Sequence, residues 1–299
     1  ATQQRRESGP NSPALYKPVG NGTSPLLLAV QNGHFELAIA LVDAGADPND
    51  RRTGFTPLQT LTWVRRPDSS DASEPAPVGS GRLTSLQFVR EIVKRGANVN
   101  LRLDKGAPKI PNTSSRVGTE GATAFLLAAD RSDVGLMRLL VELGADPLLP
   151  NFNNTTPLMM AAGLETTEPL EEAGEEPEAI EAVKLLLDLG ADINAVDNNG
   201  DTAMHGAAYN NYPLVVKLLA DRGADPKVWN QPNKQGVTPL FAAEGHIGRL
   251  PRPDPPTIAA VTSLMLAASL STDGQRPAIV DIYEKPAAPP KKPEKPEKP

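Results

Sequence analysis

The chain has 299 residues, of which 39% are hydrophobic and only 4% aromatic, and it contains 31 prolines and 24 glycines. So many turn-forming residues disfavour a single compact globule and favour an elongated stack with long connections. The absence of cysteine excludes disulfides, thiol catalysis and thiolate metal sites, and the net charge of −6 disfavours nucleic acid as a partner, because phosphate binding needs many cations.

The charge is unevenly distributed along the chain. Residues 1–110 hold 14 basic and 10 acidic side chains, a net of +4, whereas residues 111–283 hold 11 and 23, a net of −12. Such a polar field can orient a charged partner. The alternative is that one glutamate-rich stretch dominates the sum.

The first 20 residues lack hydrophobic periodicity and contain three prolines, which predicts an extended N-terminal arm over residues 1–20. The polar opening from Ala1 is typical of the end left by signal-peptide removal. We therefore expect a periplasmic or otherwise extracytoplasmic protein, with a cytoplasmic location as the alternative. The longest apolar run, Ile258–Leu270, is shorter than the roughly 20 residues of a membrane-spanning helix, so no span is expected.

The first unit after the arm predicts a pair of helices. Ser24 is placed to cap the first helix and Pro25 to occupy its first turn, where a missing N–H costs nothing. Asn32-Gly33 then turns the chain into a second helix with apolar residues at helical spacing. Gly45 follows that helix and suits a left-handed closing residue.

Both ends of this unit recur along residues 21–270, which predicts a stack of similar units. A capped start, Thr-Pro-Leu or a variant, opens each unit, and Gly-Ala-Asp or Gly-Ala-Asn closes five of them. The starts lie at Ser24, Thr56, Thr123, Thr156, Thr202 and Thr238, and the closures begin at Gly45, Gly96, Gly144, Gly190 and Gly223.

Four predicted insertions interrupt the stack. They cover residues 62–84, 101–120, 164–178 and 245–257. The third contains seven glutamates, but it lacks the Asp/Asn-Gly spacing of a calcium loop, which favours a solvated charge run. The fourth leads into the helix predicted around Ile258–Leu270, which we expect to cap the stack. Residues 271–299 are predicted to be a Pro/Lys/Glu-rich tail that favours polyproline II.

The order of turn, Thr-Pro-Leu, helix pair and Gly-Ala-Asp resembles the ankyrin-repeat family, in a bacterial-type form with long insertions. The resemblance implies an all-α solenoid of about six helix-turn-helix repeats with short projecting hairpins. It also implies a non-enzymatic scaffold that binds a protein partner through its hairpin tips and concave helices. The alternative is a structural or accessory subunit of an envelope or redox multiprotein assembly, held by the insertions and the tail.

Carried over position by position, the resemblance places partner-binding residues on the hairpin tips and at the end of one inner helix. Phe152 and Trp229 are the strongest candidates, because exposed aromatic side chains anchor interfaces. Each could instead pack beneath its own hairpin. The candidate residues are Arg51, Arg52, Phe55, Phe152, Asn153, Asp197, Asn198, Asp201, Tyr209, Asn210, Trp229 and Val237.

The three histidines do not predict a catalytic or metal-binding set. We expect His34 to pack against the neighbouring repeat and His205, which matches the His of the family's Thr-Pro-Leu-His phrase, to bond to hairpin backbone. His246 has only Glu244 nearby, which is too sparse for zinc. The sequence also lacks a phosphate-binding Gly-Lys-Ser/Thr loop and a Gly-x-Ser-x-Gly elbow. We therefore expect neither enzymatic activity nor a cofactor.

Overall fold

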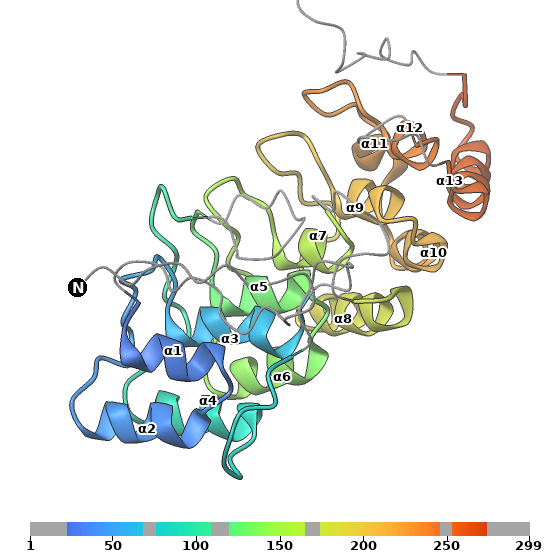
Figure 1. Ribbon diagram of the computed structural model, residues 1–299. Coiled ribbons are helices and arrows are strands. Elements are labelled where there is room, and N and C mark those ends of the chain that lie inside the picture. The colour runs from blue at the N-terminus through green and yellow to red at the C-terminus, as the bar shows by residue number, and fades with distance from the viewer. Residues whose placement is uncertain (1–22, 68–75, 109–119, 165–173, 246–252, 274–299) are drawn as a thin grey trace, which may run out of the picture.

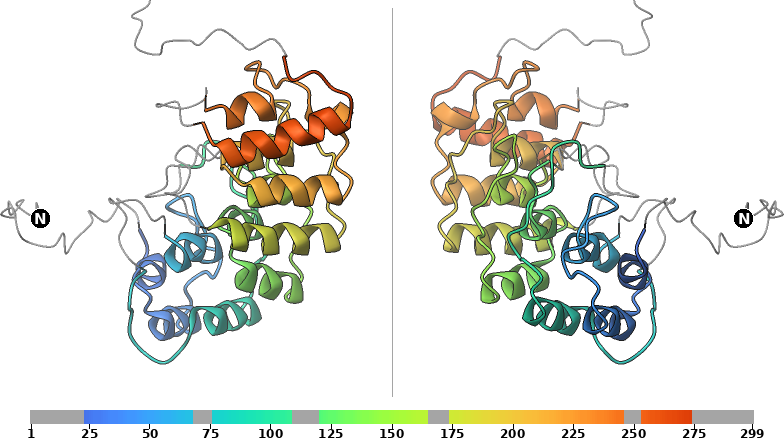
Figure 2. Two further views of the ribbon diagram at one scale, coloured as in Figure 1. Left: turned by 90° about the vertical axis from the view of Figure 1, so that its right-hand side faces the viewer. Right: turned by 90° about the vertical axis from the view of Figure 1, so that its left-hand side faces the viewer.

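The computed structural model describes residues 23–67, 76–108, 120–164, 174–245 and 253–273. Over these ranges the secondary structure is helical throughout, without a strand (Figure 1). Six helix pairs stack side by side, and their inner and outer helices form two layers (Figure 2). The predicted all-α solenoid of about six repeats is confirmed.

Each layer contains one helix from every pair. The inner helices are α1 (Pro25–Gln31), α3 (Pro57–Arg65), α5 (Ala124–Asp130), α7 (Pro157–Ala161), α9 (Ala203–Tyr209) and α12 (Pro239–Ala243). The outer helices are α2 (Phe35–Asp43), α4 (Ser85–Lys94), α6 (Val134–Glu142), α8 (Glu176–Asp188), α10 (Pro213–Asp221) and α13 (Pro255–Ala267). A single turn, α11 (Pro226–Trp229), lies before the sixth pair.

All six inner helices begin at the predicted caps. In each, the Ser or Thr hydroxyl accepts a hydrogen bond from the backbone N–H three residues on, as Ser24 does from Leu27. Thr56 and Gln59 complete a reciprocal capping box. Helices of five to nine residues are marginal on their own, so a cap and tertiary packing together hold each of them.

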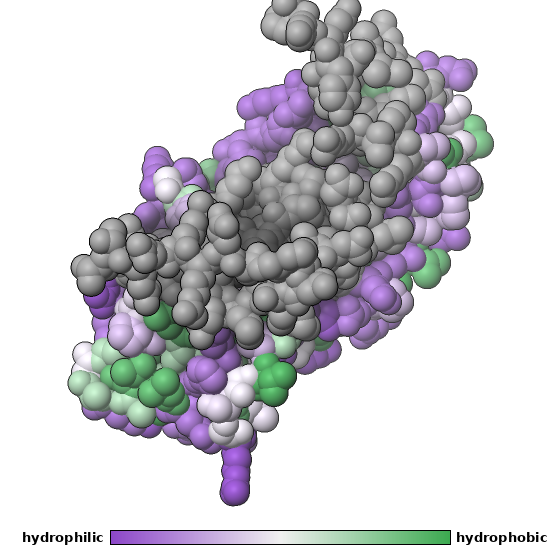
Figure 3. Space-filling model, in the orientation of Figure 1, coloured by the Kyte–Doolittle hydropathy of each residue, from purple (hydrophilic) through white to green (hydrophobic). Residues whose placement is uncertain are grey.

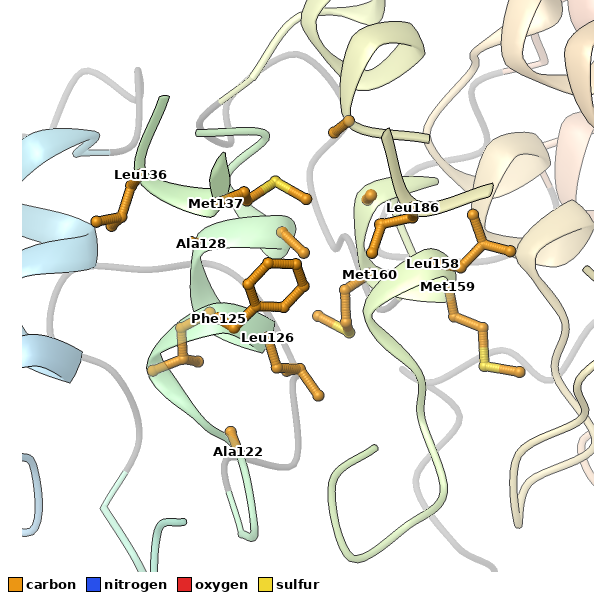
Figure 4. Packing of buried hydrophobic residues seen from close by; sticks show 14 of the residues in the cluster. Ala122, Phe125, Leu126, Ala128, Leu136, Met137, Leu158, Met159, Met160 and Leu186 are labelled. Carbon is orange, nitrogen blue, oxygen red and sulfur yellow. The ribbon is translucent and has the colours of Figure 1, made fainter. Parts of the chain in front are cut away.

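The core is continuous between neighbouring repeats. Figure 4 shows Phe125 of α5 pointing toward α7, where Met160 lies, with Met137 of α6 above the ring. All three side chains are buried, together with Ala128 and Leu186. One large ring packed among methionines and leucines fills the space between the two repeats.

The five closing glycines have the left-handed backbone that the sequence predicts, with φ between +89° and +100°. A Cβ at any of them would meet no atom within 4 Å. Glycine is therefore required at these positions by backbone conformation and not by space.

Gly190→Ala is expected to lower the free energy of unfolding by about 1–2 kcal/mol, because alanine resists the left-handed region. The matched control is Gly135→Ala in α6, where φ is ordinary and a Cβ would make only a normal contact at 3.6 Å. That change should stabilise by up to about 1 kcal/mol through helix propensity. Urea denaturation measures both. Equal effects at the two positions would contradict the closure assignment.

Asparagine side chains link the closures of successive repeats. Asn49 donates to the Gly96 carbonyl at 2.8 Å and accepts from the Asn98 N–H at 2.7 Å. Asn100 makes the same two bonds to the Gly144 carbonyl and the Asp146 N–H, and Asn194 accepts from the Asp225 N–H. The equivalent position between repeats three and four is Leu148, four residues after Gly144, and its side chain is 44% exposed. A leucine cannot make these bonds, so this link is missing at that one junction.

Leu148→Asn is expected to raise the free energy of unfolding by about 1 kcal/mol, because it supplies up to two net hydrogen bonds to the Gly190 carbonyl and the Asp192 N–H. Asn100→Leu, the reverse change one repeat earlier, should lower it by a similar amount. Thermal unfolding of both variants tests the pair. If Leu148→Asn is neutral while Asn100→Leu destabilises, the fourth closure is not aligned for the link.

Three predicted insertion boundaries are wrong by a few residues. α3 continues to Arg65, so Trp63 is a buried helical residue and the first insertion starts later than residue 62. α8 begins at Glu176 and α13 at Pro255, before the predicted ends of their insertions. In both cases proline occupies the first helical turn, where it is compatible with a helix.

The last residues of the first insertion pack against repeat one. The Glu36 carboxylate accepts from the backbone N–H groups of Arg82 and Leu83 at 2.7 and 3.2 Å. A Cβ on Gly79 would lie 2.2 Å from the Gly33 carbonyl oxygen. This segment therefore links the second repeat back to the first. The predicted arm (1–20), most of the tail (271–299), His246 and most of the glutamate-rich run lie outside the described residues.

Candidate protein-binding surface

The hairpin turns form one connected edge, which projects beyond the inner helices (Figure 1). Backbone N–H groups of Phe152, Asn198 and Lys234 each donate to a carbonyl of the preceding hairpin, at 2.8–3.0 Å. Hydrogen bonding of this kind holds neighbouring turns in register, so side chains at their tips have fixed relative positions.

A buried polar side chain organises each of the last three hairpins. The Oδ1 atoms of Asn151, Asp197 and Asn233 each accept two backbone N–H groups from their own turn. Asp197 Oδ2 also accepts from Thr155 Oγ1 of the preceding hairpin at 3.2 Å. Each hairpin is rigid because its turn cannot change shape without breaking the hydrogen bonds to this buried acceptor.

Burial raises the pKa of the Asp197 carboxyl, while its hydrogen bonds from backbone N–H groups oppose that shift. Between about pH 3.9, the usual pKa of an unfolded aspartate, and the raised folded pKa, the folded protein keeps a proton that the unfolded chain releases. Lowering the pH through this window therefore stabilises the folded state.

Asp197→Asn should remove this cost while keeping the two N–H contacts, as Asn151 and Asn233 do at their own turns. We expect the variant to melt above wild type at pH 7, and the difference to shrink as the pH falls toward 4. Differential scanning calorimetry across that range measures it. A variant that melts below wild type at pH 7 would show that the charged contact to Thr155 outweighs desolvation.

Phe152 is the exposed aromatic residue of this edge, with 42% of its surface accessible. Its ring lies against Gly121, where an added Cβ would come within 2.6 Å of a ring carbon. The Arg102 guanidinium lies over the ring, 4.7 Å from the ring centre, and Lys105 Nζ is 6.0 Å away. The ring is therefore held in place and still open to solvent.

The predicted site residues divide by exposure. Arg51, Arg52, Phe152 and Asn198 are exposed, and Asn153 and Tyr209 are half-buried, so these six stay predictions. The remaining six are buried, and the expectation that they are available to a partner is wrong. The buried candidates are Phe55, Asp197, Asp201, Asn210, Trp229 and Val237.

The buried candidates have identifiable packing partners. Trp229, only 2% exposed, belongs to the core beneath its hairpin. Phe55 makes an edge contact with Trp63 of α3, with ring centres 4.8 Å apart. Val237, like Phe55, directly precedes a capping threonine, where the chain turns into the helix and its side chain faces inward.

The concave helices offer less surface than the resemblance implies. Every residue of α7 and α12 is buried, and so are all but the last residue of α3, α5 and α9. Only α1 among the inner helices has an exposed residue, Pro25. In the described structure, the side chains open to a partner therefore lie on the hairpins and the outer helices.

The outer helices have a mixed surface, with exposed leucines at Leu37, Leu214 and Leu266 and with ion pairs between repeats. Arg95 pairs with Asp43, Arg90 with Glu142 and Arg222 with Asp188. Figure 3 shows many hydrophilic side chains along the outer-helix side of the stack, and apolar side chains near α1 and α2. Exposed pairs of this kind contribute little stability each, so this layer presents a mixed, solvated surface.

His205 is structural, as predicted. Its Nε2 lies 3.3 Å from the Val237 carbonyl of the next hairpin and its Nδ1 3.0 Å from Thr202 Oγ1, and burial lowers its pKa. Sequence reasoning missed that Gln59 does the same in repeat two, donating to the Ala122 carbonyl at 3.3 Å. The signal was available, because Gln59 follows Thr-Pro-Leu in the place of that histidine. His34 Nδ1 lies 2.8 Å from Ser80 Oγ of the first insertion, and the predicted packing of its ring against the neighbouring repeat stays a prediction.

Acidic side chains near the glutamate-rich run have structural partners. Glu178 pairs with Arg66, whose hydrogen bonds lower the glutamate's pKa, and Glu176 accepts from the Leu214 N–H at the start of α10. Among the described residues, no three His, Asp or Glu side chains are grouped to hold a metal ion.

None of the helices in the described ranges is long and apolar enough to cross a membrane.

Comparison with known proteins identifies the repeats. The family described as "Ankyrin repeats (3 copies)" matches residues 170–249, and "Ankyrin repeat" matches residues 21–52. The structure places one such helix pair in residues 21–52 and repeats of the same design in 170–249. The chain is an ankyrin-repeat protein, and its repeats are protein–protein interaction modules.

Several curated proteins are similar to parts of the chain. Human ankyrin repeat and SOCS box protein 6 is 34% identical over 111 residues, 35% of this chain and 24% of that protein. The E3 ubiquitin-protein ligase KEG of Arabidopsis thaliana is 29% identical over 205 residues, 62% of this chain and 12% of that protein. The mitochondrial disaggregase of Bos taurus is 29% identical over 204 residues, 66% of this chain and 25% of that protein. The chain spans about a quarter or less of the length of these relatives.

Proposed function

We propose that this protein is a non-enzymatic scaffold that binds a partner protein at its hairpin edge, with Phe152 as the anchor. The observation that carries the proposal is a rigid, 42% exposed phenylalanine on a row of hydrogen-bonded turns. A side chain that is already fixed loses little conformational entropy on binding. Aromatic anchors of this kind account for much of the affinity of protein interfaces.

Two further observations support the hairpin edge over other surfaces. The inner helices are buried almost completely, so they contribute few contacts. The outer helices carry ion pairs and solvated charges, which are depleted at the centre of protein interfaces. Binding rather than catalysis is proposed because the polar side chains grouped among the described residues cap helices, hold turns and form ion pairs between repeats.

Phe152→Ala is expected to weaken retention of the native partner by at least about tenfold, since loss of an aromatic anchor commonly costs about 2 kcal/mol or more. The bait is the full chain, and the readout is quantitative mass spectrometry of what stays bound from an extract of the source cells. The control is Leu214→Ala, which removes an apolar side chain of α10 that is 51% exposed and lies away from the hairpins. Melting curves should be unchanged for both variants.

Retention that survives Phe152→Ala would contradict the proposal. If the same partner is then lost on removal of residues 285–299, the protein is better described as an accessory subunit held in a larger assembly by its tail. The predicted extracytoplasmic location stays a prediction, and extracts of separated compartments address it in the same experiment.

A further inference from the structure

The cations around Phe152 indicate the charge of the partner that binds there. Arg102 donates from Nε to the Gly121 carbonyl at 3.0 Å and from Nη2 to the Pro150 carbonyl. Both acceptors are neutral, and within the described residues Arg102 has no carboxylate partner. Its positive charge is therefore held over the Phe152 ring without being neutralised.

Lys105 adds a second cation at the same place. Its Nζ lies 6.0 Å from the centre of the Phe152 ring, and among the described residues it has no ion-pair partner. Two cations from one loop thus face one exposed ring. An unpaired cation beside an aromatic face gains only part of the energy of an ion pair, so both remain able to attract an anion.

The nearby carboxylates have other partners. Asp104 pairs with Arg51 at 3.1 Å, and Glu120 Oε1 accepts from the Gly106 N–H at 2.6 Å. In the described structure neither acid forms an ion pair with Arg102 or Lys105. The surroundings of the ring differ in this way from the outer helices, where Arg90, Arg95 and Arg222 each meet a carboxylate of the neighbouring repeat.

An apolar side chain lies in the next hairpin. Val196 is 49% exposed and directly precedes buried Asp197, as Pro150 precedes buried Asn151 in the Phe152 hairpin. Its hairpin is bonded to the Phe152 hairpin, since the Asn198 N–H donates to the Asn153 carbonyl at 2.9 Å. The edge therefore combines two exposed apolar side chains with two unpaired cations.

We infer that the partner segment received here is an acidic peptide, with carboxylates flanking one aromatic or aliphatic side chain. The apolar side chain would lie against Phe152 and Val196, and the carboxylates would pair with Arg102 and Lys105. This inference rests on the proposed function, since it names the chemistry of the partner at the same surface. Complementary charge also speeds association and disfavours basic partners.

Random dodecapeptides displayed on phage, selected on the full chain, test the inference. Sequences kept are those that wild type retains and Phe152→Ala does not. We expect them to contain more Asp and Glu than Lys and Arg, around a central apolar residue. Synthetic copies of the enriched peptides should bind Lys105→Glu about three- to tenfold more weakly than wild type, measured by fluorescence anisotropy at low salt.

Lys217→Glu is the matched control, because it makes the same change of net charge on an exposed outer-helix position of α10. It should leave the affinity unchanged. Arg102→Lys keeps the charge and should retain the acidic preference, whereas Arg102→Gln should reduce it, with melting curves confirming that both variants are folded.

The possible outcomes separate the two proposals. Phe152-dependent peptides without an acidic excess, or equal losses from Lys105→Glu and Lys217→Glu, would overturn the acidic-partner inference and leave the hairpin surface standing. If Phe152→Ala retains every peptide that wild type retains, the proposed binding surface itself is wrong.

Discussion

The close approach of the inner helices is the constraint on which the rest of the structure depends. Gly206 of α9 shows how tight it is, because a Cβ there would lie 2.6 Å from the backbone nitrogen of Leu164, just after α7. Ala203, Ala207 and Ala208 of the same helix are also buried. Helices of this length cannot persist alone, so stability comes from contact between repeats and the stack holds together as a unit.

This constraint also decides where a partner can bind. Buried inner helices leave little surface for recognition, and the outer layer carries ion pairs between repeats. The hairpins remain, and their buried Asn151, Asp197 and Asn233 fix the turns so that the exposed positions are free to vary. A rigid scaffold with variable tips can acquire specificity without altering its fold.

The sequence predicts the features that depend on local geometry. Caps and closing glycines are readable because each is fixed by a few consecutive residues, and the structure has all of them. Burial of Trp229 and Val237 was not readable, since it depends on how a hairpin lies over the next repeat. The pairing of Arg102 with Phe152 joins residues 50 positions apart across an irregular connection, and no local pattern predicts it.

The junction between repeats three and four connects stability with binding. Its asparagine link is missing at Leu148, so the two closures there are joined by fewer polar contacts than their neighbours. The same connection continues into the Phe152 hairpin, which is bonded to the next hairpin through Thr155 and Asp197 and through backbone hydrogen bonds. A partner that contacts Phe152 and Val196 together would bind to both hairpins that follow the two closures of this junction. Any ligand that binds only the folded stack stabilises it by mass action, so binding at the tips would offset the missing asparagine link at this junction.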